Sequence, residues 1–86
     1  MLARFEHALK RMEALDATYP GEPAFASIIA QLSHIIQCLR EGASPVVADK
    51  PFTFGFFGVR FVREFDTAIS RELSELKAWI DAEYGG

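Results

Sequence analysis

Apolar residues recur every three or four positions along three long stretches of this chain, and this spacing constrains the fold more than any other feature. A period near 3.6 residues gathers such side chains on one face of a helix, where they can be buried together. The spacing predicts helices over residues 2–18, 23–41 and 67–84. The apolar residues are Leu2, Phe5, Leu9, Met12 and Leu15, then Phe25, Ile28, Ile29, Leu32, Ile35, Ile36 and Leu39, then Ile69, Leu73, Leu76, Ile80 and Tyr84.

Helix-breaking residues separate these stretches. Two prolines and a glycine fall within residues 19–23, which predicts a turn, and Pro23 suits the first turn of the next helix. Gly42 is placed to end the second helix, because glycine adopts the left-handed cap conformation at little cost. Asp66 is one of several candidate N-caps for the last helix. The short connections favour antiparallel packing of neighbouring helices.

The segment from residue 52 to residue 65 is ambiguous. Six of its fourteen residues are phenylalanine. Those at positions 52, 54 and 56 alternate as on a strand, whereas those at 54, 57, 61 and 65 are spaced as on a helix. The glycines at 55 and 58 weaken both interpretations. We predict a helix over residues 53–65, because no second strand is available to pair with this one, and a hairpin is the alternative.

Length and composition indicate one small globular domain. The chain has 86 residues, of which 50% are hydrophobic and 24% are charged, so it has room for one core and is too apolar for a disordered chain. We therefore predict an all-α fold, a single four-helix bundle-like domain spanning residues 1–86. The lone cysteine, Cys38, cannot form an internal disulfide, which is typical of a reducing compartment.

Two further observations bear on location. The first ten residues lack the apolar stretch of a secretory signal peptide. Residues 23–39 carry no formal charge, but they include five polar side chains, which argues against a membrane span. We expect a cytoplasmic protein without a membrane partner.

Acidic residues gather in the last quarter of the chain. Nine basic and twelve acidic side chains give a net charge of -3, which disfavours broad nucleic-acid binding. From residue 64 onward, Arg71 and Lys77 are outnumbered by Glu64, Asp66, Glu72, Glu75, Asp81 and Glu83. The plainer interpretation is a solvated helix face. The sharper one is a docking surface for a basic partner.

No set of residues fits a catalytic or metal site. His34 and Cys38 are four residues apart, which places both on one side of a helix, yet they supply two ligands where a structural zinc site takes four. Cys38 also lacks a positioned base or a basic environment to activate it. We expect no cofactor and no metal. An enzyme using His7, His34 and Cys38 is a rival interpretation.

The segment 55–63 contains two features that bear on phosphate binding. The glycines at 55 and 58 lack the preceding strand and the Gly-Lys-Ser/Thr sequence of a P-loop. Arg60 and Arg63 are three residues apart, a spacing that can clamp an anion. Such arginines more often form ion pairs along the helix, here with Glu64, and we expect that arrangement.

Aromatic residues supply the remaining candidates for a binding surface. The favoured interpretation of the phenylalanine-rich segment is a central helix buried on most sides. The alternative is that Phe52 or Phe54 stays exposed as a partner-binding patch. Trp79 lies about a quarter turn from the main apolar stripe. It either packs at the edge of the core or anchors an interface.

Several motifs, taken in order, resemble a known family. They are Tyr19-Pro20-Gly21, Gln31-Leu32-x-x-Ile35, Gly58, Val62-Arg63-Glu64-Phe65-Asp66 and Glu72-Leu73. Through these motifs, over about residues 5–84, the chain resembles the small all-helical immunity proteins of bacterial type VI secretion. The best-known member of that family neutralises an NAD(P)+-degrading toxin. The chain departs from the family pattern in its many phenylalanines between residues 52 and 61.

The resemblance implies a cytoplasmic antidote that is not an enzyme and that blocks the toxin domain of a cognate effector. It leaves the toxin open among an NAD(P)+ glycohydrolase, an ADP-ribosyl transferase and a nucleotide pyrophosphokinase. An acidic face could occupy a basic nucleotide-binding cleft in place of substrate phosphates. We expect the partner-binding residues to be Glu64, Asp66, Glu72, Glu75, Trp79, Phe52 and Phe54. A helical adaptor or oligomerisation module is the alternative function.

Overall fold

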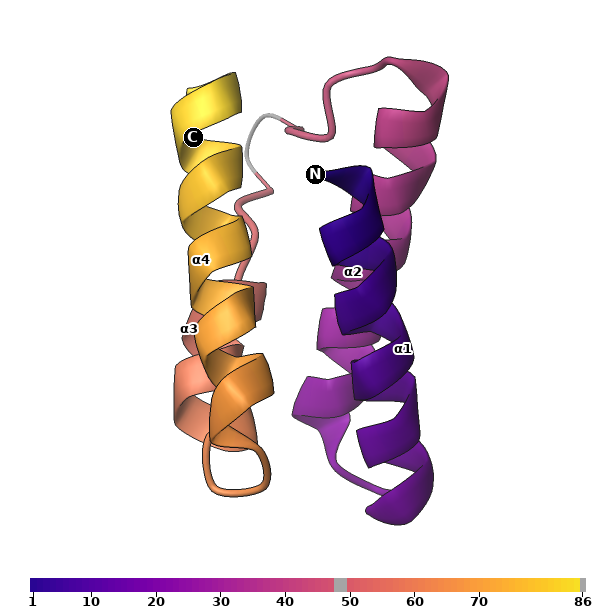
Figure 1. Cartoon of the computed structure of the whole chain (residues 1–86), viewed down its shortest axis with the longest axis vertical. Helices are drawn as coiled ribbons and strands as arrows, with labels where there is room; N and C mark the ends of the chain where they lie inside the picture. The colour runs from indigo at the N-terminus through magenta and orange to yellow at the C-terminus, as the bar shows by residue number, and fades with distance from the viewer. Residues whose placement is uncertain (48–49, 86) are drawn as a thin grey trace.

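The computed structural model describes residues 1–47 and 50–85. Its elements are helix α1 (Leu2–Thr18), helix α2 (Pro23–Glu41), the short helix α3 (Phe54–Phe57), the π-helical turn η1 (Gly58–Val62) and helix α4 (Thr67–Tyr84) (Figure 1). No strand occurs among the described residues. The predicted all-α fold is therefore confirmed, and α1, α2 and α4 have the bounds that the apolar spacing predicted.

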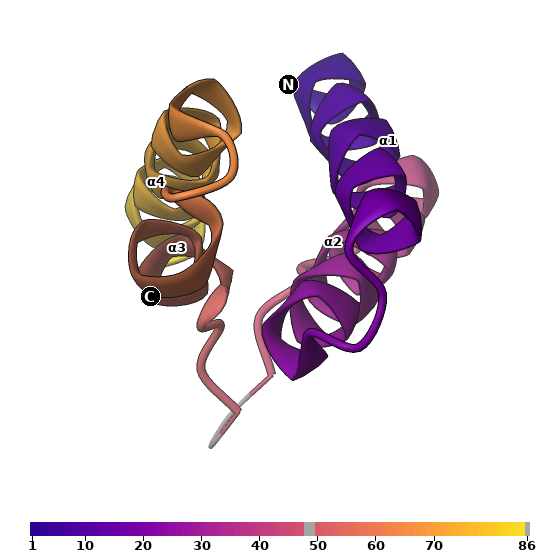
Figure 2. The same ribbon diagram turned by 90° about the horizontal axis from the view of Figure 1, so that it is seen from below.

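The helices are arranged as two pairs. Helices α1 and α2 run antiparallel in one pair, and α3, η1 and α4 form the other (Figure 1). Seen from below, the two pairs lean toward each other at an angle (Figure 2). The long connection after α2 passes from the first pair to the second.

The predicted apolar stripes meet in one core between the pairs. Each of the three long helices contributes fully buried side chains, and α3 and η1 add one each: Phe5, Met12, Phe25, Ile28, Leu32, Ile35, Phe54, Val62, Ile69, Leu73, Leu76 and Ile80. The ring of Phe5 lies 6.5 Å from that of Phe54 and 5.9 Å from that of Trp79, both edge to face. These contacts join α1 to α3 and α4.

The helix ends follow the predicted capping. Pro23 stands in the first turn of α2, and Gly42 ends that helix with a φ of 71°. At the start of α4, Asp66 is the N-cap, and its Oδ1 accepts a hydrogen bond from the Ile69 amide at 3.1 Å. Such a cap satisfies one of the amides that a helix leaves without an internal partner.

The phenylalanine-rich segment differs from its prediction. Instead of one helix over residues 53–65, it forms α3 followed by η1, in which the Arg63 amide donates to the Gly58 carbonyl oxygen five residues back, at 3.0 Å. The predicted helix is confirmed over residues 54–62, with a π turn in its second part, and the hairpin alternative is wrong, since no strand pairing occurs between residues 52 and 65. The buried positions of the segment are Phe54, Gly55, Gly58 and Val62.

The side of this segment that faces α4 consists of glycine rather than phenylalanine. A Cβ atom added at Gly55 would lie 2.8 Å from Cβ of Lys77, and one added at Gly58 would lie 3.0 Å from Cδ1 of Leu73. The Ser70 hydroxyl donates to the Gly58 carbonyl oxygen at 2.9 Å. The expectation of a helix buried on most sides is therefore wrong: glycines make the contact, and Phe56 is turned outward.

Candidate partner-binding surfaces

Two of the acids expected to face a partner bind α1 instead. Arg4 Nε donates to Glu72 at 3.0 Å, and the other end of the same guanidinium donates to Glu72 and, at 3.2 Å, to Glu75. The hydrogen bond from Arg4 and its positive charge lower the pKa of Glu72 below its ordinary value, against the opposing effect of burial. These acids therefore join α4 to α1.

Asp66 has a similar structural role. It pairs with Arg11 of α1 and also caps α4 through the Ile69 amide. Burial acts to raise the pKa of Asp66, but the hydrogen bonds from Ile69 and Arg11 outweigh it, so the pKa lies below its ordinary value. We call this group the α1–α4 charged seam; its members are Arg4, Arg11, Asp66, Glu72 and Glu75.

Phe54, expected as a possible partner-binding residue, is fully buried and cannot contact a partner. Its position at the start of α3 directs it between the two helix pairs, where it meets the ring of Phe5. Phe52 is half-buried, with its ring 6.0 Å from that of Phe54 and 6.1 Å from that of His34. It lies at the edge of the core rather than on a free surface.

The other expected binding residues, Trp79 and Glu64, differ from each other. The ring of Trp79 is partly buried and stacks edge to face on Phe5 and Tyr84, both at 5.9 Å. Glu64 is exposed and forms no ion pair with any residue that the structure describes, so the expected pairing with Arg60 is absent there.

His34 and Cys38 lie together on α2, with Sγ of Cys38 3.7 Å from Nε2 of His34. The same ring nitrogen lies 2.9 Å from the Pro45 carbonyl oxygen, which attaches the connection after α2 to that helix. Across residues 1–47 and 50–85, no three His, Cys, Asp or Glu side chains gather closely enough to hold a metal ion. The contact with the Pro45 carbonyl oxygen gives His34 a structural role.

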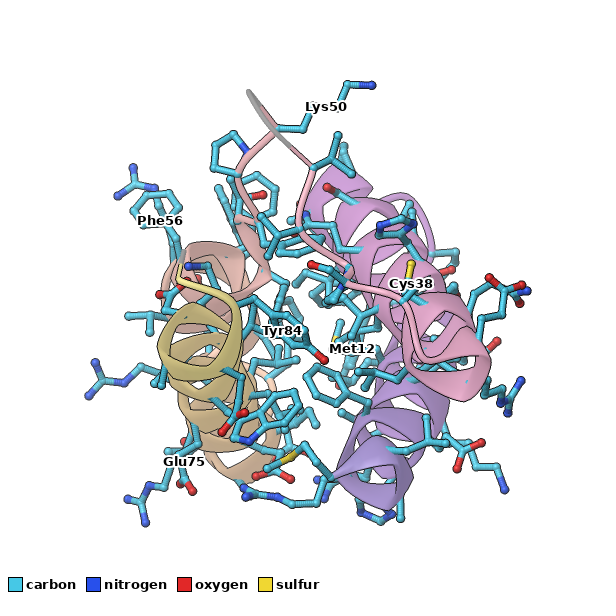
Figure 3. All side chains as sticks on the ribbon, turned by 90° about the horizontal axis from the view of Figure 1, so that it is seen from above. Met12, Cys38, Lys50, Phe56, Glu75 and Tyr84 are labelled. Carbon is cyan, nitrogen blue, oxygen red and sulfur yellow. The ribbon has the colours of Figure 1, made fainter. Side chains whose placement is uncertain are left out.

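A surface that the sequence did not predict lies on the outside of α3 and η1. Phe56 is 63% exposed and Val59 is 50% exposed. The rings of Phe57 and Phe61 lie 5.7 Å apart beside them, and the Arg60 guanidinium lies 5.9 Å from the Phe61 ring. Figure 3 shows Phe56 pointing away from the helices, whereas Met12 and Tyr84 point between the two pairs. We call Phe56, Phe57, Val59, Arg60 and Phe61 the outward face.

Two shallow hollows flank the outward face. One, of about 400 Å³, lies between Phe56, Val59 and the side of α4 that carries Lys77. The other, of about 540 Å³, lies between the ring of Phe57 and the start of α2. The first is bordered by charges that neutralise each other, because Nζ of Lys77 lies 2.6 Å from Oδ1 of Asp81. The outward face is therefore apolar apart from Arg60, with a shallow hollow on either side.

The sequence held one indication of this surface, the glycines at positions 55 and 58. Residues three apart share a helix face, so two glycines at that spacing allow a neighbouring helix to approach closely. Phenylalanines between and beside such glycines must then lie on the other faces. The periodicity of the phenylalanines alone pointed to the opposite orientation.

The small helical bundle with no strand among its described residues agrees with the class that the sequence motifs implied, the type VI secretion immunity proteins. Residues 1–82 match the model of the Tsi6 family of such proteins, so this chain belongs to the Tsi6 family. No curated protein and no solved structure matches the chain. Within the described residues, no helix is long and apolar enough to cross a membrane.

Proposed function

We propose that this protein is an immunity protein that binds and blocks the toxin domain of a cognate type VI secretion effector. The observation that carries the proposal is the match to the Tsi6 family over residues 1–82. The protein inhibits the toxin by binding to it and not by catalysing a reaction. An inhibitor of this kind needs an exposed surface that is not already used in folding, and the outward face meets that requirement.

The size of the protein is sufficient for tight inhibition. A stable complex buries roughly 800 Å² on each partner. The protein exposes 5108 Å² in total. One partner site would therefore cover about a sixth of its surface.

We propose that the complex forms in the cytoplasm. We also propose that the reaction it blocks consumes a nucleotide. The candidate toxins are an NAD(P)+ glycohydrolase, an ADP-ribosyl transferase and a nucleotide pyrophosphokinase. All three draw on nucleotides that bacteria keep inside the cell. A single cysteine, with no internal disulfide to form, is compatible with that compartment.

A rescue assay tests the function. The toxin domain encoded beside this gene is expressed in a sensitive bacterium with and without this protein, and viability is counted. We expect rescue, together with a 1:1 complex of the purified proteins in sedimentation. Absence of both rescue and complex, with each protein folded, contradicts the proposal. Self-association of this protein in the same experiment would then favour the adaptor function.

A further inference from the structure

We propose that the toxin docks on the outward face, with Phe56 inserted into an apolar pocket of the toxin and Arg60 paired with a carboxylate beside that pocket. The proposal rests on the proposed function and adds to it the surface used and the chemistry of the toxin's side of the interface. It replaces the acidic surface on α4 that the sequence had suggested.

The first step is the exposure of the phenylalanine. Phe54 is completely buried, yet Phe56, two residues further on, is 63% exposed and is followed by Val59 at 50%. Burying a phenylalanine side chain is one of the larger stabilising contributions available to a small domain. In this fold Phe56 receives little of it. Adjacent exposed apolar side chains of this kind mark interaction sites.

The second step is the rigidity of the support beneath the exposed side chains. The Gln31 carboxamide oxygen of α2 accepts hydrogen bonds from the amides of Thr53 and Phe54, at 2.7 and 2.9 Å, and so holds the start of α3. Ser70 of α4 holds the Gly58 carbonyl oxygen in η1. A surface that is already ordered loses less entropy when a partner binds.

The third step is the charge of the segment. Arg60 and Arg63 are exposed, and neither forms an ion pair with a residue inside the described ranges 1–47 and 50–85. Glu64 is the one acid between residues 56 and 64. Asp81, beside the first hollow, is paired with Lys77. Between residues 56 and 64 two arginines outnumber one acid, so this segment is positive although the chain as a whole is acidic; Glu22 borders the second hollow.

These observations define the partner's side of the interface. An exposed aromatic ring flanked by an arginine matches the composition of interface hot spots, which are rich in aromatic residues and arginine. A carboxylate on the toxin would satisfy Arg60 with a charge-assisted hydrogen bond. The residues of the charged seam cannot bind the toxin in this way without breaking the ion pairs that they form between α1 and α4.

The test measures binding of the same toxin domain to four variants of the full chain by calorimetry. Phe56→Ala and Arg60→Glu alter the outward face. Val46→Ala truncates an exposed valine in the connection after α2, and Lys10→Glu reverses an exposed charge on α1, so they are matched controls. Melting curves followed by circular dichroism verify that every variant folds.

We expect Phe56→Ala to raise Kd by about 30-fold or more, as truncation of a hot-spot residue does. Arg60→Glu raises Kd by about tenfold or more, because it places a negative charge against the toxin's carboxylate. Both controls stay within about twofold of the unmodified protein, as is usual for residues outside a hot spot.

Each contrary result has a distinct meaning. If the unmodified protein rescues and binds but both outward-face variants bind as it does, the docking surface is wrong and the immunity function stands. If Arg60→Glu binds more tightly, the proposal that Arg60 pairs with a carboxylate of the toxin is wrong. If the unmodified protein forms a dimer that Phe56→Ala abolishes, the outward face binds a second copy of this chain, and the proposal that it binds the toxin is wrong. Failure of the unmodified protein to rescue or bind overturns the function, and the docking proposal with it.

Discussion

The charged seam and the outward face use their residues in opposite ways. In the seam, five charged side chains are matched to one another across two helices. On the outward face, apolar side chains lie against solvent with an arginine beside them. Charge is expected to face solvent and phenylalanine to lie in a core, yet here the charges are paired with one another across two helices and Phe56 remains exposed.

The comparison shows that the role of a side chain depends on which residue the fold brings against it. Glu72 is 68 residues from Arg4 in the sequence and is bound to it in the structure. Phe56 is surrounded by phenylalanines in the sequence, but glycines occupy the side that meets α4. The following predictions separate residues that stabilise the fold from residues that remain available to a partner.

The largest expected effect concerns two phenylalanines that are two residues apart. Phe54→Ala removes a fully buried ring and should lower the free energy of unfolding by about 3–5 kcal/mol. Phe56→Ala should change it by less than about 0.5 kcal/mol, because the ring is exposed. Urea unfolding measures both. Equal losses in the two variants would mean that Phe56 belongs to the core.

The next effect concerns the glycine contact with α4. Gly58→Val adds a branched side chain where a single Cβ would already lie 3.0 Å from Leu73, a buried residue. We expect a loss of about 1–3 kcal/mol from overpacking. Valine has a higher helix propensity than glycine, so propensity cannot account for such a loss. Ala82→Val, at an exposed position of α4, tests an added valine where nothing crowds it. A Gly58→Val protein as stable as the unmodified protein would show that η1 and α4 are not closely packed.

The helix pattern was the most predictable part of this protein. The stripes containing Phe5, Leu32 and Leu73 follow the helical period and are buried as expected, since a local pattern suffices to define an amphipathic helix. The segment after residue 52 was not predictable in the same way. Its orientation is decided by how closely Gly55 and Gly58 approach α4, a tertiary contact that outweighs the spacing of the phenylalanines.

The candidate site was predicted less well than the fold. The sequence identified the acids of α4 but not their partners, because Arg4 and Arg11 lie far away along the chain. It identified an excess of phenylalanine but assigned Phe54, rather than Phe56, to the surface. Both errors come from pairings between distant elements, which composition and spacing do not contain.

A smaller effect separates the two functions of Asp66. Asp66→Ala removes the cap of α4 and should lower the free energy of unfolding by about 0.5–2 kcal/mol. Asp66→Asn keeps a side-chain oxygen for the Ile69 amide and loses the charge that faces Arg11. We expect it to retain most of the stability, since partly exposed ion pairs contribute little. If both variants lose the same amount, the ion pair rather than the cap is the main contribution.

The smallest effect is the pH dependence that Glu72 confers. Arg4 lowers the pKa of Glu72 in the folded protein, so the unfolded chain takes up a proton at that position more readily. Its contribution to stability is therefore complete above the ordinary pKa of a glutamate, near 4.5, and is lost as the pH falls through the lower folded value. The effect is small, because Arg4 is exposed and solvent screens the pair.

Glu72→Gln isolates this contribution when the urea midpoint is followed from pH 7 to pH 3. The variant should lose less stability over that range than the unmodified protein does, because it has no carboxylate at position 72 to protonate. Glu83→Gln, on an exposed part of the same helix, should leave the profile unchanged. If Glu72→Gln and Glu83→Gln give the same profile, the seam does not bind Glu72 tightly, and the acidic side of α4 becomes available to a partner after all.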